Sequence, residues 1–281
     1  MASRQRTLAE YQDFMGHKRV HESAAVWTIY HAIDSETANP FQAYQATRYI
    51  DTAIPHIPVT AHGLKENGYA TIATTNWLPY SWSVNNIAFA EVMHTALSYF
   101  QAGRADAGYK LLKSSVLDGM YLGDSPGNFG QISFYDAARG ECYRDFGDPI
   151  GVASRVLIQG LFGILPDALN QQIILRPGFP DDWDKASVST PDISYRFTRK
   201  EDTDTYHITQ RFQTPLHPVL QINARKEKIR SVKVNGVPAT WQSIESAHGY
   251  PLLSIQAEGT SSTTITIEWE GASLHTLQSK N

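Results

Sequence analysis

The sequence predicts a multi-domain α + β protein, with a helical region over residues 1–170 and an antiparallel β-sandwich over residues 171–281. The first region contains helical patterns separated by long, aromatic-rich loops. The second consists of short segments in which apolar and polar residues alternate, separated by turn residues, as in antiparallel sheets. A chain of 281 residues is also long enough for two domains of ordinary size.

The clearest predicted helix covers residues 84–102. It is apolar on almost every side and stops before Gly103, a residue type that often follows the last turn of a helix. A helix that is apolar all round is buried all round. We therefore expect this helix to lie at the centre of the helical region.

Two further helices and a weaker one are expected. Residues 105–120 are amphipathic, with an apolar stripe that runs from Tyr109 to Met120. The next helix should begin with Asp148 as N-cap and Pro149 as first residue, and end at Gly163. The weaker pattern covers residues 40–48. Residues 54–80 and 122–147 are predicted loops, and ordered loops of such length are usually functional.

The second region has strong strand and turn signals. Ile193, Tyr195 and Phe197 alternate with polar residues, as do Ile265, Ile267 and Trp269 near the end of the chain. Asn235-Gly236 follows a run of β-branched residues and predicts a tight hairpin. Several short strands with such turns predict a sandwich.

Composition excludes several classes of partner. The net charge of −4 and the lack of a basic stripe make nucleic acid an unexpected partner. The apolar runs are too short to insert into a membrane. Cys142 is the only cysteine, and the ten histidines show no metal-ligand spacing, so neither a disulfide nor a metal is expected. No phosphate-binding glycine loop is present, and no cofactor is expected.

The first ten residues are polar and contain no apolar segment of the kind that signal peptides have. A complete chain of this kind would stay in the cytoplasm. A fragment of a longer precursor would be compatible with a periplasmic or secreted location.

Several stretches carry a resemblance to a known group of enzymes. They are residues 75–86, residues 125–148, Gly163-Ile164-Leu165-Pro166-Asp167 and residues 174–183. These sequence stretches resemble the junction in bacterial (α/α)6-toroid glycosidases and phosphorylases, where the last barrel helix leads into a C-terminal β-sandwich. It is similar to α-L-rhamnosidases and, over residues 15–270, to the C-terminal region of large glycosidase-like proteins of polysaccharide-utilising bacteria.

The resemblance implies a partial toroid. A complete toroid has twelve helices, whereas only three or four fit before residue 170, so the chain is either a fragment of a longer enzyme or a truncated relative. A partial barrel would expose the apolar flank of residues 84–102. We therefore expect self-association or a partner that supplies the missing part of the barrel.

The resemblance also implies a pair of carboxyl groups for glycoside hydrolysis, in loops at the mouth of the toroid. The candidates are Glu141, Asp145 and Asp148, and Arg144 is a candidate for holding a substrate carboxylate. The alternatives are an ion-pair cluster of Glu141, Arg144 and Asp145, and a capping role for Asp148. The second carboxylate of the pair could also lie outside this chain.

A second candidate surface precedes the apolar helix. Trp and Tyr rings stack on sugars and Asn side chains bind hydroxyl groups, so a substrate-binding role is expected for Trp77, Tyr80, Trp82, Asn85 and Asn86. The alternative is a loop that packs against the helix. Glu91 and His94 lie one turn apart deeper in that helix, and a buried, hydrogen-bonded pair is expected there rather than the alternative, a catalytic pair.

The predicted function is that of the C-terminal part of a glycoside hydrolase acting on a plant or host polysaccharide or oligosaccharide. One alternative is a non-catalytic carbohydrate-binding or structural module. Another is a polysaccharide lyase, which would need Tyr80, His56 and Arg144 as its proton-transfer and uronate-binding groups.

Overall fold

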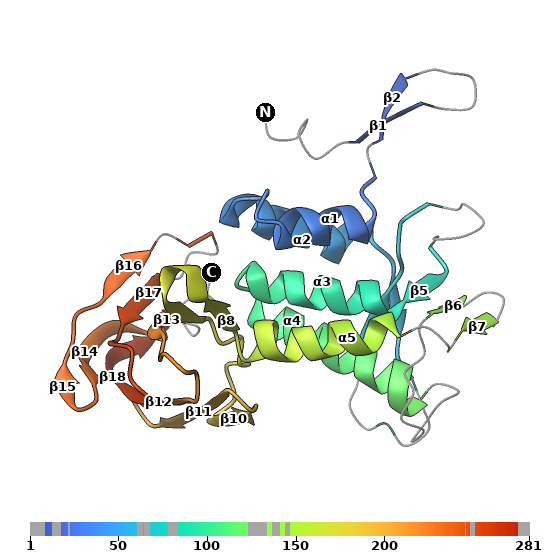
Figure 1. The fold of residues 1–281 in the computed structure, drawn as a ribbon. Coiled ribbons are helices and arrows are strands. Elements are labelled where there is room, and N and C mark those ends of the chain that lie inside the picture. The colour runs from blue at the N-terminus through green and yellow to red at the C-terminus, as the bar shows by residue number, and fades with distance from the viewer. Residues whose placement is uncertain are drawn as a thin grey trace. The chain divides into compact units, whose positions relative to one another are not determined.

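The computed structural model describes residues 9–12, 18–21, 23–60, 64, 68–77, 84–122, 134–136, 141–143, 147–244, 246–247 and 251–274. The chain forms two compact units, Met1–Val156 and Leu157–Asn281, both drawn in Figure 1. It is a mixture of helices and mainly antiparallel sheets, as the sequence predicts. The domain boundary at residues 170 and 171 and the toroid both stay predictions.

The first unit is helical. Its described α-helices are α1 (Val26–Asp34), α2 (Pro40–Ala53), α3 (Phe89–Gln101), α4 (Ala105–Val116) and α5 (Asp148–Arg155). Helix α4 continues into a π-helical segment, Leu117–Leu122, and α5 is followed by another, Val156–Leu161. Helix α3 packs against the other four α-helices and is the centre of the unit.

Helix α3 confirms the prediction of a buried helix. Phe89, Met93, Ala96 and Leu97 are all at most 1% exposed. The chain also turns after α3 at Gly103, whose φ of 75° is the left-handed conformation expected there. Because α3 is covered within its own unit, the expectation that its apolar flank faces water is wrong. Self-association remains a prediction, but an exposed apolar flank of α3 no longer supports it.

The beginning of α3 differs from the prediction. Residues Asn86–Ala88 form a strand, β5, and the helix starts only at Phe89. Strand β5 pairs with β6 (Phe134–Asp136), which in turn pairs with β7 (Glu141–Tyr143). The partner strand lies far along the chain, so local periodicity could not distinguish this strand from an early helical turn.

Helices α1 and α2 extend what the sequence predicted. The weak helix at residues 40–48 is α2, which starts at Pro40 but runs on to Ala53. A capping box begins it: Asn39 accepts from the Gln42 backbone N–H, and the Gln42 side chain accepts from the Asn39 N–H. Helix α1 was not predicted. It has no side-chain cap, and nine residues give little room for a periodic pattern.

Two details of α4 and α5 are corrections. The buried face of α4 carries Gly108, Leu111, Leu112 and Ser115, whereas Tyr109 is only half-buried. The N-cap of α5 is Gly147, and Asp148 is the first helical residue. An acid in the first turn is favourable because the N-terminal end of a helix carries partial positive charge.

Short strands occur between the helices. In the first unit β1 (Ala9–Gln12) pairs with β2 (Lys18–His21), and β3 (His56–Pro58) pairs with β4 (Ala70–Ile72). Strands β3 and β4 lie within residues 54–80, and β6 and β7 lie within residues 122–147. Both predicted loops therefore contain paired strands.

The second unit contains two sheets, as a sandwich requires. The six-stranded sheet has the order β10-β11-β12-β18-β14-β15 and the five-stranded sheet the order β16-β17-β13-β9-β8. The six-stranded sheet consists of β10 (Lys185–Ser189), β11 (Ile193–Lys200), β12 (Thr203–Gln210), β14 (Lys226–Val234), β15 (Val237–Pro238) and β18 (Ser262–Ser273). The five-stranded sheet consists of β8 (Ile164–Asp167), β9 (Gln172–Leu175), β13 (His217–Asn223), β16 (Gln242–Ile244) and β17 (Leu252–Gln256). Strands β9 and β13 are parallel, so the second sheet is mixed rather than purely antiparallel.

The core of this unit follows the predicted alternation. Tyr195 and Phe197 of β11 and Ile265, Ile267 and Trp269 of β18 are at most 1% exposed. Their neighbours along each strand point away from the core, as the pleat of a strand requires. The alternation therefore assigned these side chains to the correct face.

One buried charge lies among these strands. Asp204 is 1% exposed and accepts hydrogen bonds from the Arg199 Nε at 2.9 Å and from the Trp269 Nε1 at 2.9 Å. Arg225 adds an ion pair, with its Nε 3.3 Å from the second carboxylate oxygen. Two cations and an indole therefore compensate the desolvated carboxylate.

Two glycine positions fix the turns. Asn235 and Gly236, with φ of 51° and 81°, form the two-residue turn between β14 and β15 that the sequence predicts. Gly163 precedes β8 with φ of 64°, and a Cβ there would lie 2.0 Å from the Arg176 carbonyl oxygen. Only glycine fits this contact.

Candidate functional site

Two of the three predicted acidic residues, Glu141 and Asp148, lie in described segments of the chain. Glu141 of β7 is the register partner of Asp136 of β6, and Asp136 is the register partner of Asn86 of β5. Strand β5 runs directly into α3. Asp148 is the first residue of α5 and is exposed. Asp145, Arg144, Tyr80 and Trp82 lie outside the described residues.

In Figure 1, α3 and α5 begin at the same end of the helical unit, beside β5. The two helices are in contact. Glu91 lies in the first turn of α3 and Asp148 in the first turn of α5. Tertiary structure thus brings together two carboxyl groups from distant parts of the sequence.

Glu91 is the most perturbed acid of this group. Its Oε2 atom is buried and has no hydrogen-bond partner. Burial raises the pKa of Glu91 to about 8, and the negative charge of Asp148 adds to the rise. A carboxyl group with this pKa is mostly protonated at pH 7, so Glu91 is able to donate a proton.

A group of aromatic and imidazole rings lies next to Glu91, with His94 on α3 and Tyr30 and His31 on α1. His94, one turn after Glu91, stacks on Tyr30 of α1 with the ring centroids 4.7 Å apart. His31 lies beside Tyr30 at 4.5 Å and 6.4 Å from His94. Burial lowers the pKa of His94, and the positive charge of Arg155 lowers it further, so His94 is neutral at pH 7.

The hydroxyl group of Tyr30 is also perturbed. Burial raises the pKa of Tyr30, and the negative charges of Glu91 and Asp148 raise it further. Tyr30 therefore remains a protonated phenol across the physiological pH range. It is able to donate a hydrogen bond but is a poor base.

An ion pair lies further along α1 and α5. Arg155 binds Asp34 through two hydrogen bonds of 2.6 and 2.7 Å, and Gln101 of α3 donates to the same carboxylate at 2.9 Å. Burial alone would raise the pKa of Asp34, but the bonds from Arg155 and Gln101 outweigh it and the pKa is lowered. This contact joins α1, α3 and α5.

The aromatic loop is only partly described. Trp77 is half-buried and packs edge-on against Trp27 of α1, with ring centroids 6.5 Å apart. Asn86 is completely buried, and its carbonyl oxygen accepts from the Thr74 N–H. Asn85 is half-buried. The burial of Asn86 favours packing against the helix, the alternative to sugar binding, for this residue.

Sequence reasoning missed the most perturbed part of this site. It expected Glu91 and His94 to be a buried, hydrogen-bonded pair rather than a catalytic one, whereas the Glu91 Oε2 has no hydrogen-bond partner and His94 stacks on Tyr30. It did not name Tyr30, Asp34 or Arg155. The presence of a glutamate in an otherwise apolar helix was the available signal, since a buried carboxyl group is uncommon and often functional.

The described residues contain no cluster of three or more histidine, cysteine, aspartate or glutamate side chains able to bind a metal ion. Nor does any helix in the described part of the chain have the length and hydrophobicity needed to cross a membrane.

Comparisons with known proteins give similarities only among solved structures. No family model and no curated protein matches the chain. An alpha-L-rhamnosidase from Dictyoglumus thermophilum matches with 11% identity and a TM-score of 0.42, over 64% of this chain and 21% of that one. A GH127 beta-L-arabinofuranosidase from Geobacillus Stearothermophilus matches with 11% identity and a TM-score of 0.35, over 88% and 42%.

A further solved structure, described as a glycoside hydrolase, matches with 11% identity and a TM-score of 0.38, over 87% of this chain and 46% of that one. The chain thus spans less than half the length of each of these three structures. The similarity to them is partial and distant.

Proposed function

We propose that the helical unit carries the acid–base site of a glycoside hydrolase, with Glu91 as the proton donor and Asp148 as the second carboxylate. The observation that carries this proposal is the protonation of the Glu91 carboxyl group at neutral pH. It is a half-buried carboxyl group with one buried, unpartnered oxygen and a pKa of about 8, and it lies in the field of a second, exposed carboxylate.

Glycosidases need two carboxyl groups in different protonation states, and different environments produce that difference. In the proposed reaction Glu91 gives its proton to the glycosidic oxygen as the bond from that oxygen to the anomeric carbon breaks. A water molecule attacks the anomeric carbon, and Asp148 takes the proton that the water loses. Glu141 and Asp145 remain proposed alternatives for the second carboxylate, since both precede α5 closely in the chain.

The proposed site belongs at the mouth of a toroid. Tyr30 of α1, Glu91 of α3 and Asp148 of α5 are electrostatically coupled there, while α2 and α4 also pack against α3. We propose that α1, α3 and α5 are inner helices of such a ring. The rest of the ring, and with it a complete substrate cleft, would come from other residues of a longer protein or from a partner.

A polysaccharide lyase is the second candidate, because Tyr30 and His94 are stacked and the charge of Arg155 acts on His94. Two features weigh against it. The raised pKa of Tyr30 makes this phenol a weak base. Arg155 makes two hydrogen bonds to Asp34, so its guanidinium is already neutralised by a carboxylate and is poorly suited to binding a uronate. His56, from the sequence-based version of this hypothesis, has its Nδ1 2.9 Å from the Ile54 carbonyl oxygen.

The hydrolase proposal is tested with aryl glycosides of neutral sugars that differ in their leaving group. Glu91→Gln should slow hydrolysis of phenyl glycosides by roughly a hundredfold or more, because their leaving group needs a proton. Dinitrophenyl glycosides, whose leaving group needs none, should be affected far less. Glu36→Gln, at an exposed position of the same unit, is the matched control.

The pH profile gives a second readout. With a pKa of about 8, Glu91 is protonated at lower pH, so hydrolysis of phenyl glycosides should decline as the pH rises through about 8. Equal losses on both leaving groups in folded Glu91→Gln would contradict the assignment. Because the rest of the ring is expected from other residues, the assays use the protein or complex that carries it. Hydrolysis of neither series by that protein would overturn the proposal, and binding of the same glycosides without hydrolysis would favour a non-catalytic carbohydrate-binding module.

A further inference from the structure

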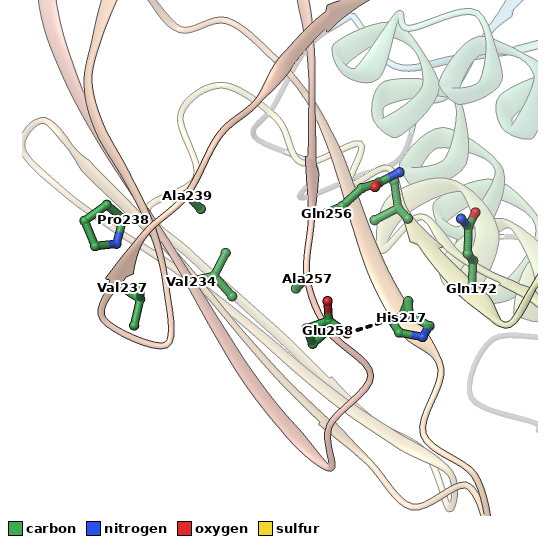
Figure 2. Close-up of a pocket in the computed structure, with 10 residues that line it drawn as sticks. Gln172, His217, Val234, Val237, Pro238, Ala239, Gln256, Ala257 and Glu258 are labelled. Atoms are coloured by element: carbon green, nitrogen blue, oxygen red, sulfur yellow. Dashed lines mark ion pairs between the residues drawn. The ribbon is translucent and has the colours of Figure 1, made fainter.

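A cavity of about 310 Å³ lies within the second unit, and all the residues that line it belong to that unit. Its volume is at the lower end of the range typical of small-molecule sites, roughly 300 to 1,000 Å³. Figure 2 shows its lining: Val234, Val237 and Pro238 lie on one side, and Gln172, Gln256 and His217 lie on the other, with Glu258 between the two groups.

The polar side of the cavity comes from one end of the five-stranded sheet. Gln172 is the first residue of β9 and the register partner of His217, the first residue of β13. Gln256 is the last residue of β17 and the register partner of Val219. The core side chains Ile173, Leu220 and Ile255 alternate with them along the strands and face the other way. The side chains of Gln172, His217 and Gln256 therefore lie outside the hydrophobic core of the sandwich.

The cavity lining contains both hydrogen-bond donors and hydrogen-bond acceptors. The Nδ1 of His217 accepts from the Gly259 backbone N–H at 3.0 Å, so the neutral ring carries its proton on Nε2 and is a donor there. The 3.6 Å contact between this Nδ1 and the Glu258 carboxylate is too long for a hydrogen bond and is secondary to the bond from Gly259. Each glutamine amide is both donor and acceptor, and Glu258 is an acceptor.

The charge of the lining excludes one class of ligand. Among the described residues that line the cavity there is no lysine or arginine, and the Glu258 side chain is 91% exposed. A phosphate or a uronate would therefore find no fixed cation to replace its hydration, so anions are disfavoured.

The mixture of polar and apolar walls excludes another class. A purely apolar ligand would remove two amides and an imidazole from water without replacing their hydrogen bonds, which is unfavourable. Sugars meet both requirements, because their hydroxyl groups donate and accept while their C–H faces pack on apolar side chains. The wall of Val234, Val237 and Pro238 offers such a packing surface.

We propose that this cavity is a binding site for a neutral saccharide unit, with Gln172, Gln256 and His217 binding its hydroxyl groups and the β14–β15 hairpin packing on its apolar face. The site is built from residues of the second unit alone, whereas Glu91 belongs to the first unit, and the proposal gives the cavity no part in bond cleavage. It shares with the proposed function only the chemical class of the ligand, and does not depend on catalysis in the helical unit.

The test is binding to the full chain, measured by saturation-transfer NMR and calorimetry. The probes are methyl glycosides of neutral pentoses and hexoses, with glucuronic acid as the charged comparator. The double variant Gln172→Ala, Gln256→Ala should weaken binding of the neutral glycosides by about tenfold or more, since each deletion removes hydrogen bonds to the ligand. Gln242→Ala, an exposed amide of β16 outside the cavity lining, is the matched control and should bind normally.

Glu91→Gln separates this site from the proposed catalytic site. Binding that persists in Glu91→Gln and is lost in the double glutamine variant supports the cavity site, whether or not the chain hydrolyses any glycoside. Binding that is lost in Glu91→Gln and retained in the double variant would assign the ligand to the helical unit and overturn the proposal. No saturable binding of any neutral probe up to concentrations on the order of 10 mM, or tighter binding of glucuronic acid than of the neutral glycosides, would also overturn it.

Discussion

Replacing Glu91 with glutamine should stabilise the protein at alkaline pH and change its stability little at acid pH. Glutamine has nearly the same shape as a protonated glutamate but cannot ionise. In the folded protein the pKa of Glu91 is about 8, whereas the ordinary value is 4.5. Between these two values the folded state holds a proton that the unfolded state has released, so folding becomes less favourable as the pH rises.

The size of the effect follows from this difference in pKa. The stability associated with the proton of Glu91 is fully present below about pH 4.5 and declines by roughly 1.4 kcal/mol for each pH unit above it. By pH 8 the loss is on the order of 4 kcal/mol, and above pH 8 it changes little. Glu91→Gln removes this penalty, so the variant should exceed the original protein in stability by that amount at pH 8 and above.

The assay is urea unfolding of both proteins between pH 4.5 and 9, followed by the helical circular-dichroism signal. The difference between the two proteins cancels the titration of other groups. Glu36→Gln, an exposed glutamate in the same unit, should show no such pH-dependent difference. A stability difference between Glu91→Gln and the original protein that is flat across this range would refute the assignment of a raised pKa to Glu91.

Two further predictions concern buried contacts of the second unit, with Gly151 of the first unit as a comparison position. Asp204→Ala should lower the free energy of unfolding by roughly 3 kcal/mol in urea titrations, because it leaves two arginines and the Trp269 N–H without their buried partner; a loss below 1 kcal/mol would contradict the role given to this carboxylate. Gly163→Ala should strongly destabilise the second unit in thermal unfolding, because its Cβ would overlap the Arg176 backbone, whereas Gly151→Ala, on α5 with nothing within 4 Å, should raise stability by about 1 kcal/mol. Comparable unfolding temperatures for the two glycine variants would refute the steric argument.

Residue patterns found the regular elements best where the pattern was local. The alternation of apolar residues placed Tyr195, Phe197 and Trp269 in the core, and Asn235-Gly236 gave the hairpin that the structure has. The apolar helix was also confirmed as central. In each case the signal lies within a few consecutive residues, because strand pleating and tight turns impose local requirements.

Elements that depend on distant partners were predicted less well. The strand β5 and the parallel pairing of β9 with β13 each need a partner from elsewhere in the chain. The missed helix α1 is short, and its burial against α3 contributes much of what holds it. Local propensity carries no information about such contacts.

By itself, the sequence determined that the chain has a helical part and a sandwich part, which side chains enter the sandwich core, and where tight turns occur. Only the tertiary structure brought Glu91 of α3 beside Asp148 of α5 and assembled the cavity between His217, Gln172 and the β14–β15 hairpin. The reason is that backbone conformation follows from neighbouring residues, whereas a pKa or a binding cavity depends on which groups approach through space and how much water they exclude.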